Sequence, residues 1–185
     1  MGPQRNLRSF FEGIFWLIFA GFTDLVYYLN MMKSLIIIDM QQSYFSKGWY
    51  DQTLISKINH RIDEVLTAGG KIVYVKNVAK NNGEPYISYF VEGLKIVGNN
   101  IFLKHAADAF TNPELDAFLK AQGATYIEVV GIDGNVCVYK TALGAGKAGY
   151  EVRYNMDCIG TKGKEIKEKT LLGLHEAGIQ YNKML

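Results

Sequence analysis

The sequence predicts a three-layer α/β/α domain, in which helices cover both faces of a mostly parallel sheet of five or six strands. Short apolar runs rich in β-branched residues alternate with segments of helical periodicity along the chain. The apolar runs are continuous rather than alternating, which is typical of strands buried on both faces. The length of 185 residues suits one such domain.

The first half of the chain supplies two strands and a helix. "SLIII" at 34–38 predicts a buried strand, and "KIVYVK" at 71–76 predicts a second. Between them, residues 53–70 place apolar side chains on one face at helical spacing and end in two glycines, a helix stop. Residues 77–99 have weak periodicity; "PYISYFVEGL" at 85–94 predicts a short helix there, or a cover over a site.

The second half repeats the alternation. In chain order it predicts a strand at 100–104, a helix at 112–124, a strand at 125–130, a helix at 136–147, a strand at 150–154, a helix at 164–178 and an edge strand at 179–182. Asn112 as N-cap and Pro113 at the first helical position mark the start of the first of these helices.

Composition excludes several classes of protein. A net charge of +2 with scattered lysines gives no sign of nucleic-acid binding. Two cysteines cannot form a disulfide scaffold for a chain of this size. We therefore expect a reducing, cytoplasmic setting.

The N-terminal residues 1–30 differ from the predicted domain at 31–185. Gly13–Phe22 is an unbroken apolar run of ten residues, whereas crossing a bilayer takes about 20. We favour a translation start at the methionine pair 31–32. The alternatives are a signal peptide, a packing helix, or membrane association through residues 10–28, which would place the protein at a membrane.

Three chemically capable side chains follow predicted strands. Asp39 comes directly after the first strand, Lys104 ends the third, and Cys137 follows the fourth through a glycine-bearing turn. Ligands of open parallel sheets bind beyond the carboxyl ends of the strands. We therefore expect these three side chains to lie on one rim of the sheet.

Together these side chains outline covalent hydrolysis. A thiolate is nucleophilic, and both a helix amino end and the Lys104 ammonium would lower the pKa of Cys137. Asp39 would accept the thiol proton and return it to a leaving group. Backbone N–H groups of the turn before Cys137 would face a developing oxyanion.

Each residue also has an ordinary structural interpretation. Cys137 suits packing in a helix of small residues, Asp39 a turn cap, and Lys104 the surface. On that interpretation the domain is a non-enzymatic binding module. A nucleotide-binding domain is a further alternative, but "VGIDGNV" at 130–136 lacks the glycine pattern of a phosphate-binding loop.

Three stretches carry a resemblance to a known superfamily. "SLIIIDMQQSYF", "FLKHAADAF" and "VVGIDGNVCVYKTALGAGKAGYEVRYNMDCIG" resemble the isochorismatase-like cysteine hydrolases, in the right order from Met32 to about Thr161. The resemblance implies a Rossmann-like sheet of about six strands. It makes Asp39 the proton-shuttling acid, Lys104 its electrostatic partner and Cys137 the nucleophile.

The same resemblance implies further features of the site. A cis peptide is expected at Ile132–Asp133, with the backbone N–H groups of Asp133 and Cys137 directed at the substrate oxygen. Metal-binding members carry an aspartate-x-histidine pair where this chain has Asn77 and Ala79. Since the histidines form no substitute cluster, we expect neither a catalytic metal nor another cofactor.

The resemblance predicts a small-molecule substrate with an amide or ureide C–N bond. The alternative is a vinyl ether of the kind that isochorismatase cleaves. We expect Phe45, Trp49, Tyr86 and Tyr89 to line the pocket, because aromatic side chains suit a flat substrate. Since relatives commonly assemble, we also expect a homo-oligomer.

Overall fold

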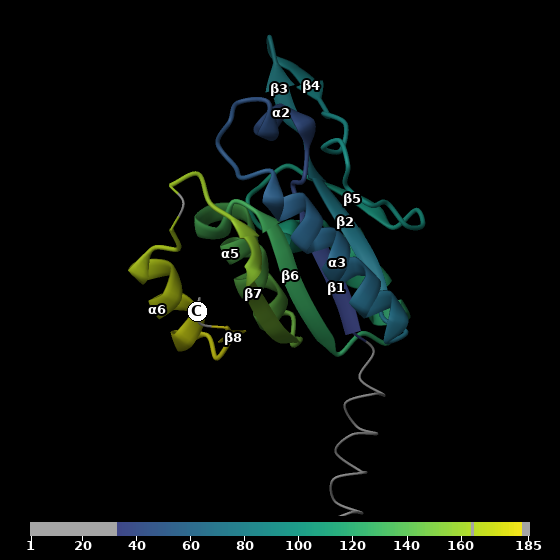
Figure 1. Cartoon of the computed structure of the whole chain (residues 1–185). Coiled ribbons are helices and arrows are strands. Elements are labelled where there is room, and N and C mark those ends of the chain that lie inside the picture. Colours follow the sequence, from purple (N-terminus) through teal and green to yellow (C-terminus); the bar gives the residue numbers. More distant parts are fainter. Residues whose placement is uncertain (1–32, 164, 183–185) are drawn as a thin grey trace, which may run out of the picture. The chain divides into compact units, whose positions relative to one another are not determined.

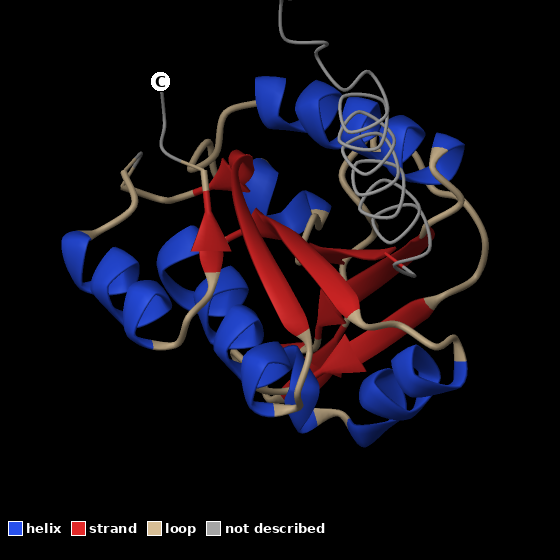
Figure 2. Ribbon diagram, turned by 90° about the horizontal axis from the view of Figure 1, so that it is seen from below, coloured by secondary structure: helices blue, strands red, loops and turns tan. Residues whose placement is uncertain are grey.

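The computed structural model describes residues 33–163 and 165–182. Six strands form one parallel sheet in the order β5-β2-β1-β6-β7-β8. Helices lie on both of its faces (Figures 1 and 2). The predicted α/β/α architecture is therefore confirmed, while the predictions for residues 1–30 lie outside the described residues.

The strands of the main sheet are β1 (Lys33–Ile38), β2 (Lys71–Asn77), β5 (Ile101–Lys104), β6 (Tyr126–Ile132), β7 (Glu151–Gly160) and β8 (Gln180–Tyr181). A separate hairpin consists of β3 (Ala79–Asn81) and β4 (Glu84–Tyr86). The helices are α2 (Gln42–Phe45), α3 (Thr53–Thr67), α4 (Pro113–Ala121), α5 (Tyr139–Lys147) and α6 (Glu168–Glu176), with short turns η1 (Ala109–Thr111) and η2 (Gly134–Val138).

Alternate side chains of the central strand enter two different cores. Leu35 and Ile37 pack with the apolar face of α3, whereas Ile36 and Ile38 pack with α4, α5 and α6 on the other side. All four are at most 1% exposed. Burial on both faces explains why β1 reads as a continuous apolar run in the sequence.

The sheet changes its winding direction at β1. The chain passes from β1 to β2 on one side, and later returns to place β6 on the other side of β1. Loops leaving the carboxyl ends of β1 and β6 therefore diverge, which opens the crevice where doubly wound sheets bind ligands. Figure 1 shows α2 and the β3–β4 hairpin beyond this end of the strands.

The predicted helix at 85–94 is wrong. The chain forms the β3–β4 hairpin across Asn82 and Gly83, whose φ angles of 51° and 89° are both positive. Asn-Gly is the pair that two-residue hairpin turns with positive φ favour, so the local turn chemistry determines the structure. Phe90 then forms an isolated bridge with Gln41.

The helix predicted at 136–147 also begins differently. Residues Gly134–Val138 form a single π-helical turn, and α5 begins only at Tyr139. Wide turns of this kind often occur at functional sites. Within residues 33–163 and 165–182, no helix has both the length and the apolar character needed to cross a bilayer.

Candidate active site

Asp39 is fixed by the backbone where β1 ends. Its φ of 54° is left-handed, and its N–H donates to the carbonyl of Val75 at the end of β2 (2.9 Å). On the other side, Gly131 of β6 lies so close that an added Cβ would stand 2.2 Å from the carbonyl oxygen of Ile38. Packed backbone on both sides therefore sets the direction of the Asp39 side chain, which is only 3% exposed.

Lys104 reaches Asp39 from the far edge of the sheet. Its ammonium donates to Oδ2 of Asp39 (2.9 Å), to the carbonyl of Ala106 (3.1 Å) and to Sγ of Cys137 (3.3 Å). A lysine ammonium has three N–H donors, and here each has an acceptor. The structure thus brings Asp39, Lys104 and Cys137 together, although 98 residues separate the first from the last (137 − 39).

Cys137 lies in the π-helical turn that follows β6. The peptide bond between Ile132 and Asp133 at the start of this turn is cis. The Asp133 carboxylate ties the turn together: Oδ1 accepts from the N–H of Asn135 (2.7 Å), and Oδ2 accepts from the N–H of Lys162 (2.8 Å) and the hydroxyl of Tyr50 (3.3 Å). The segment that carries the thiol is therefore held from β7 as well as from β6.

The electrostatic environment keeps the resting thiol protonated. Burial raises the pKa of Cys137 to about 11, and the negative charge of Asp39 adds to this effect, while Lys104 opposes it. The sequence-based expectation of a lowered pKa was wrong. The expected lowering relied on the helix end and the Lys104 ammonium, whereas burial and the neighbouring carboxylate dominate in the folded protein.

The pKa values of Asp39 and Lys104, the charged neighbours of Cys137, are also shifted from their usual ranges. Burial raises the pKa of Asp39, although Lys104 acts in the opposite direction. Burial alone would lower the pKa of Lys104, but Asp39 and Cys137 outweigh it and the net direction is upward. Lys104 therefore remains an ammonium, and Asp39 is a carboxylate with an increased tendency to take a proton.

One oxygen of Asp39 is available for chemistry. Oδ1 is buried and has no hydrogen-bond partner within the described part of the chain, whereas Oδ2 holds Lys104. An unpartnered buried carboxylate oxygen is costly for folding and commonly indicates a functional role. The Asp39 side chain also interacts with the Cys137 thiol, whose pKa its negative charge raises.

The four aromatic residues expected at the pocket are not brought together. Phe45 is 2% exposed and packs in the core beneath α3. Tyr86 and Tyr89 are 43% and 85% exposed, in and just after the hairpin. Trp49 is 36% exposed and lines a cleft between the segment after α2 and the end of β7.

Other residues, not identified from the sequence, do approach the trio. Tyr44 of α2 lies within electrostatic range of Asp39, Lys104 and Cys137, and its hydroxyl accepts from Nδ2 of Asn77 (3.0 Å). Helix α2 has only four residues, too few for a periodic pattern to show which side chain faces the site.

Gln41 fixes the loop that carries Tyr44. Its side chain accepts from the N–H of Asn77 (2.7 Å) and donates to the carbonyl of the same residue (3.2 Å). This paired bond attaches the exit of β1 to the end of β2. The glutamine in "DMQQ" was the available sequence signal, and its role was not recognised there.

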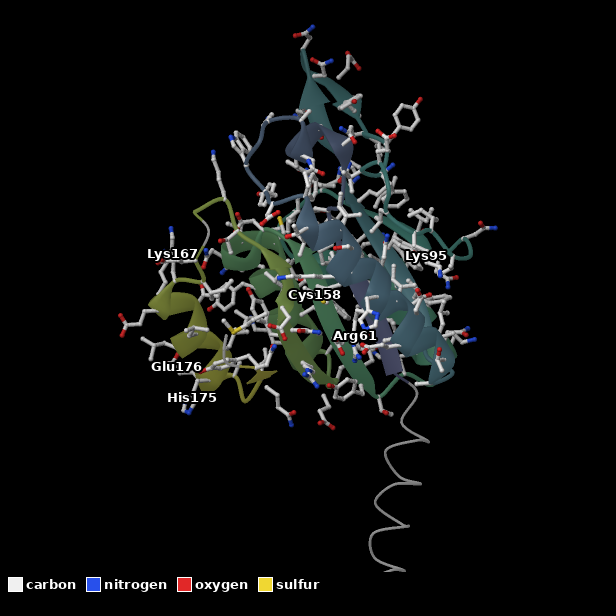
Figure 3. All side chains as sticks on the ribbon, in the orientation of Figure 1. Arg61, Lys95, Cys158, Lys167, His175 and Glu176 are labelled. Atoms are coloured by element: carbon white, nitrogen blue, oxygen red, sulfur yellow. The ribbon has the colours of Figure 1, made fainter. Side chains whose placement is uncertain are left out.

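The residues present do not provide a metal site like that of metal-binding relatives. The Asn77 amide is bonded to Tyr44, and Ala79 has no ligating atom. Among the described residues, no group of three His, Cys, Asp or Glu side chains could hold an ion. His175 projects from α6, on the opposite side of the molecule from Lys95 (Figure 3).

The comparison with protein families decides the relationship. The model described as "Isochorismatase domain" matches residues 33–180. The chain belongs to the isochorismatase family. This confirms the resemblance drawn from the sequence and makes the protein an isochorismatase-like hydrolase by family.

Three members or structural neighbours of the isochorismatase family share 18–23% of their residues with this chain. The uncharacterized family protein YddQ of Bacillus subtilis is 23% identical over 156 residues, covering 78% of this chain and 87% of YddQ. An isochorismatase family protein from Desulfovibrio vulgaris has a TM-score of 0.71 at 20% identity, covering 82% of this chain and 94% of its own. N-carbamoylsarcosine amidase from Thermoplasma acidophilum has a TM-score of 0.67 at 18% identity, covering 83% and 96% respectively. At these identities the structures support the fold alone.

Proposed function

We propose that the protein is a metal-independent cysteine hydrolase that cleaves the C–N bond of a small amide or ureide. The contact of one ammonium with both the Asp39 carboxylate and the Cys137 sulfur carries the proposal. Such an arrangement is costly to build, because two charged groups lose water together beside a half-buried thiol. The choice of a C–N bond follows the name of one protein that shares this fold, N-carbamoylsarcosine amidase, and is itself part of the proposal.

The first chemical step moves the thiol proton to Asp39. As sulfur forms a bond to the substrate carbonyl carbon, Oδ1 of Asp39 accepts the proton and the carbonyl electron pair moves onto oxygen. This base is needed because a thiol of pKa about 11 is almost wholly protonated near neutral pH. The backbone N–H groups of Asp133 and Cys137 stabilise the oxyanion in this proposal.

The second half returns the proton and releases the acid. The oxyanion collapses, the C–N bond breaks, and Asp39 gives its proton to the leaving nitrogen, which leaves a thioester on Cys137. A water molecule then attacks the thioester carbon while Asp39 accepts a proton from that water. The C–S bond breaks and sulfur recovers this proton, so that the cycle closes.

A hydrolysis screen tests the assignment. Wild-type protein, dialysed against a chelator, is assayed for ammonia release from a panel of primary amides and ureides. We expect turnover in the wild type and in Cys158→Ala, the matched variant at the other cysteine. Turnover should be lost in Cys137→Ala and reduced at least about a thousandfold in Asp39→Asn, as for loss of a general base acting with its nucleophile.

The intermediate gives an independent readout. Intact mass after rapid acid quench should show an acyl adduct in the wild type and none in Cys137→Ala. Activity that survives Cys137→Ala would refute the nucleophile. Activity lost on chelation and restored by a divalent ion would refute metal independence. A folded wild-type protein that forms no adduct and hydrolyses no amide, ureide or vinyl ether would instead support the binding module.

A further inference from the structure

The loop after β5, residues 105–109, lies along one face of the helical segment that η2 and α5 form. This face presents Cys137, Thr141 and Gly144, which are spaced four and three residues apart, as neighbours on one side of a helix are. Each of the three contacts either this loop or the lysine that precedes it. The loop therefore follows the segment that carries the thiol over about two helical turns.

The carbonyl of Ala106, in this loop, is one of the acceptors of the Lys104 ammonium. The distance between Nζ and the carbonyl oxygen is 3.1 Å, and the other two acceptors are Oδ2 of Asp39 and Sγ of Cys137. Because the Lys104 side chain is 0% exposed, a carbonyl that moved away would leave a buried N–H group without an acceptor. The position of the loop therefore contributes to the position of the ammonium between the carboxylate and the thiol.

Thr141 of α5 attaches this loop to the helix. Its side-chain oxygen accepts from the N–H of Ala109 (3.1 Å), and its hydroxyl donates a long hydrogen bond to the carbonyl of Ala107 (3.5 Å). Thr141 is 0% exposed, so a side chain without this oxygen would leave the Ala109 N–H buried and unpaired. Ala106 directly precedes the residues that Thr141 holds, and its carbonyl is therefore held through them.

Gly144 leaves room for the same loop on the next turn of α5. A Cβ at this position would stand 2.3 Å from Oδ1 of Asp108. The same carboxylate oxygen accepts from the N–H of Phe110 (2.8 Å), so the Asp108 side chain is tied to its own segment and cannot turn aside freely. The hydroxyl of Thr141 and the missing side chain of Gly144 therefore hold the loop against α5 at two neighbouring points.

We propose that Thr141 is a positioning residue of the candidate site, which holds the Ala106 carbonyl so that the Lys104 ammonium stays against the sulfur of Cys137. Thr141 contacts none of the reacting atoms in the proposed reaction and acts through the loop alone. This inference rests on the proposed hydrolase function for its effect on turnover. The contact between ammonium and sulfur can be tested apart from any reaction.

Alkylation of Cys137 tests this role without a substrate. Below the pKa of the thiol, the rate of iodoacetamide labelling follows the thiolate fraction, which Lys104 increases by lowering that pKa. Thr141→Val keeps the side-chain shape and removes the oxygen. We expect labelling of the Cys137 peptide at about pH 8.5 to slow about threefold or more. A loop that merely opened would have the opposite effect, because exposure of the thiol would lower its pKa and admit the reagent.

Further variants separate the oxygen from the packing. Thr141→Ser keeps the oxygen and should return the labelling rate to within about twofold of the wild type. Gly144→Ala pushes the loop away at the second point of contact and should slow labelling as Thr141→Val does. Gly146→Ala is the control on the same helix, since its Cβ would approach only the Ile179 side chain, at 3.9 Å, and the labelling rate should not change.

Turnover gives the second measurement, on any amide or ureide that the hydrolysis screen identifies. In Thr141→Val, kcat should fall about tenfold or more while KM stays within about twofold, because the residue acts on the reacting groups and not on substrate binding. Thr141→Ser should recover most of the lost kcat. A variant that was only less stable would show the same kcat per folded molecule as the wild type.

The two measurements separate this role from the proposed function. Unchanged or faster labelling in Thr141→Val, or an equal loss in Thr141→Ser, would overturn the positioning role, and hydrolysis by the wild type would still support the hydrolase. Slower labelling in Thr141→Val that serine restores, in a protein that hydrolyses nothing and forms no acyl adduct, would support the positioning of Lys104 and overturn the proposed function.

Discussion

The ammonium of Lys104 lies 2.9 Å from Oδ2 of Asp39, and the two side chains are 0% and 3% exposed. Each charge of a buried ion pair offsets the cost of burying the other. Removing one partner leaves the other charge buried without compensation and destabilises the fold. The pair therefore links the stability of the fold to the integrity of the candidate site.

Removal of the lysine charge is expected to destabilise the protein strongly. Lys104→Met leaves the Asp39 carboxylate buried without its partner, so the free energy of unfolding should fall by about 3–5 kcal/mol in urea titrations. Lys95→Met, which removes an exposed partner of Asp63, should cost at most about 1 kcal/mol. The double variant Asp39→Asn/Lys104→Met should recover part of the loss. Equal losses in both single lysine variants would contradict the buried pair.

The alkylation of Cys137 should report its raised pKa. The rate of iodoacetamide labelling, followed on the Cys137 peptide, should rise with a midpoint of about 11. Asp39→Asn should lower this midpoint, because the Asp39 charge raises the pKa of the thiol. The buried Cys158, with a pKa of about 12, gives a comparison within the same protein. A Cys137 midpoint at or below the free-thiol value of about 8.5 would disprove this account.

Gly131 should tolerate no side chain. Its φ of 110° is left-handed, and an added Cβ would stand 2.2 Å from the carbonyl oxygen of Ile38. Gly131→Ala should therefore force β1 and β6 apart and cost more than about 3 kcal/mol, above the usual effect of a single substitution. Gly98→Ala is the control, since its φ of 72° is also positive but no atom lies within 4 Å of the added Cβ. Similar melting temperatures for the two variants would contradict the close approach.

Tyr44 should affect turnover more than stability. Tyr44→Phe removes the hydroxyl that accepts from Asn77, so we expect a cost of about 1 kcal/mol in unfolding. Because Tyr44 lies in range of all three members of the trio, kcat/KM for any amide found in the screen should fall about tenfold or more. Tyr86→Phe alters an exposed ring on the hairpin and should leave kcat/KM unchanged. Equal kcat/KM in the wild type and Tyr44→Phe would remove Tyr44 from the site.

The sequence alone predicted those elements of the fold that have a strong hydrophobic pattern or a clear helix start. The apolar run at Leu35–Ile38, the helical face of α3 and the Asn112–Pro113 helix start all appear where the patterns predicted them. The meeting of Asp39, Lys104 and Cys137 followed from one rule, that parallel strands end at the same rim. These features depend on local periodicity or on topology, and both are visible in a single sequence.

The features that the sequence did not predict depend on very short segments or on how deeply a side chain is buried. The Asn82–Gly83 turn is a two-residue signal that a search for helical periodicity overlooks. The direction of the Cys137 pKa shift depends on how far the fold buries the thiol and on the nearby charges of Asp39 and Lys104. The spacing of residues along the sequence predicts neither the burial of the thiol nor the charges around it. The same holds for Tyr44 and Phe45, adjacent residues of which one approaches the site and the other enters the core.

The close approach of Gly131 to Ile38 has a consequence for redesign. The distance between the acid and the sulfur is set by main-chain contact between two central strands, whereas Trp49, Tyr50 and Lys162 stand on loops. Libraries that randomise Trp49 can therefore vary the wall of the cleft, whereas Tyr50 should be kept because its hydroxyl donates to the Asp133 carboxylate of the turn that carries Cys137. The close contact between Gly131 and Ile38 should therefore stay unchanged when a loop residue such as Trp49 is replaced.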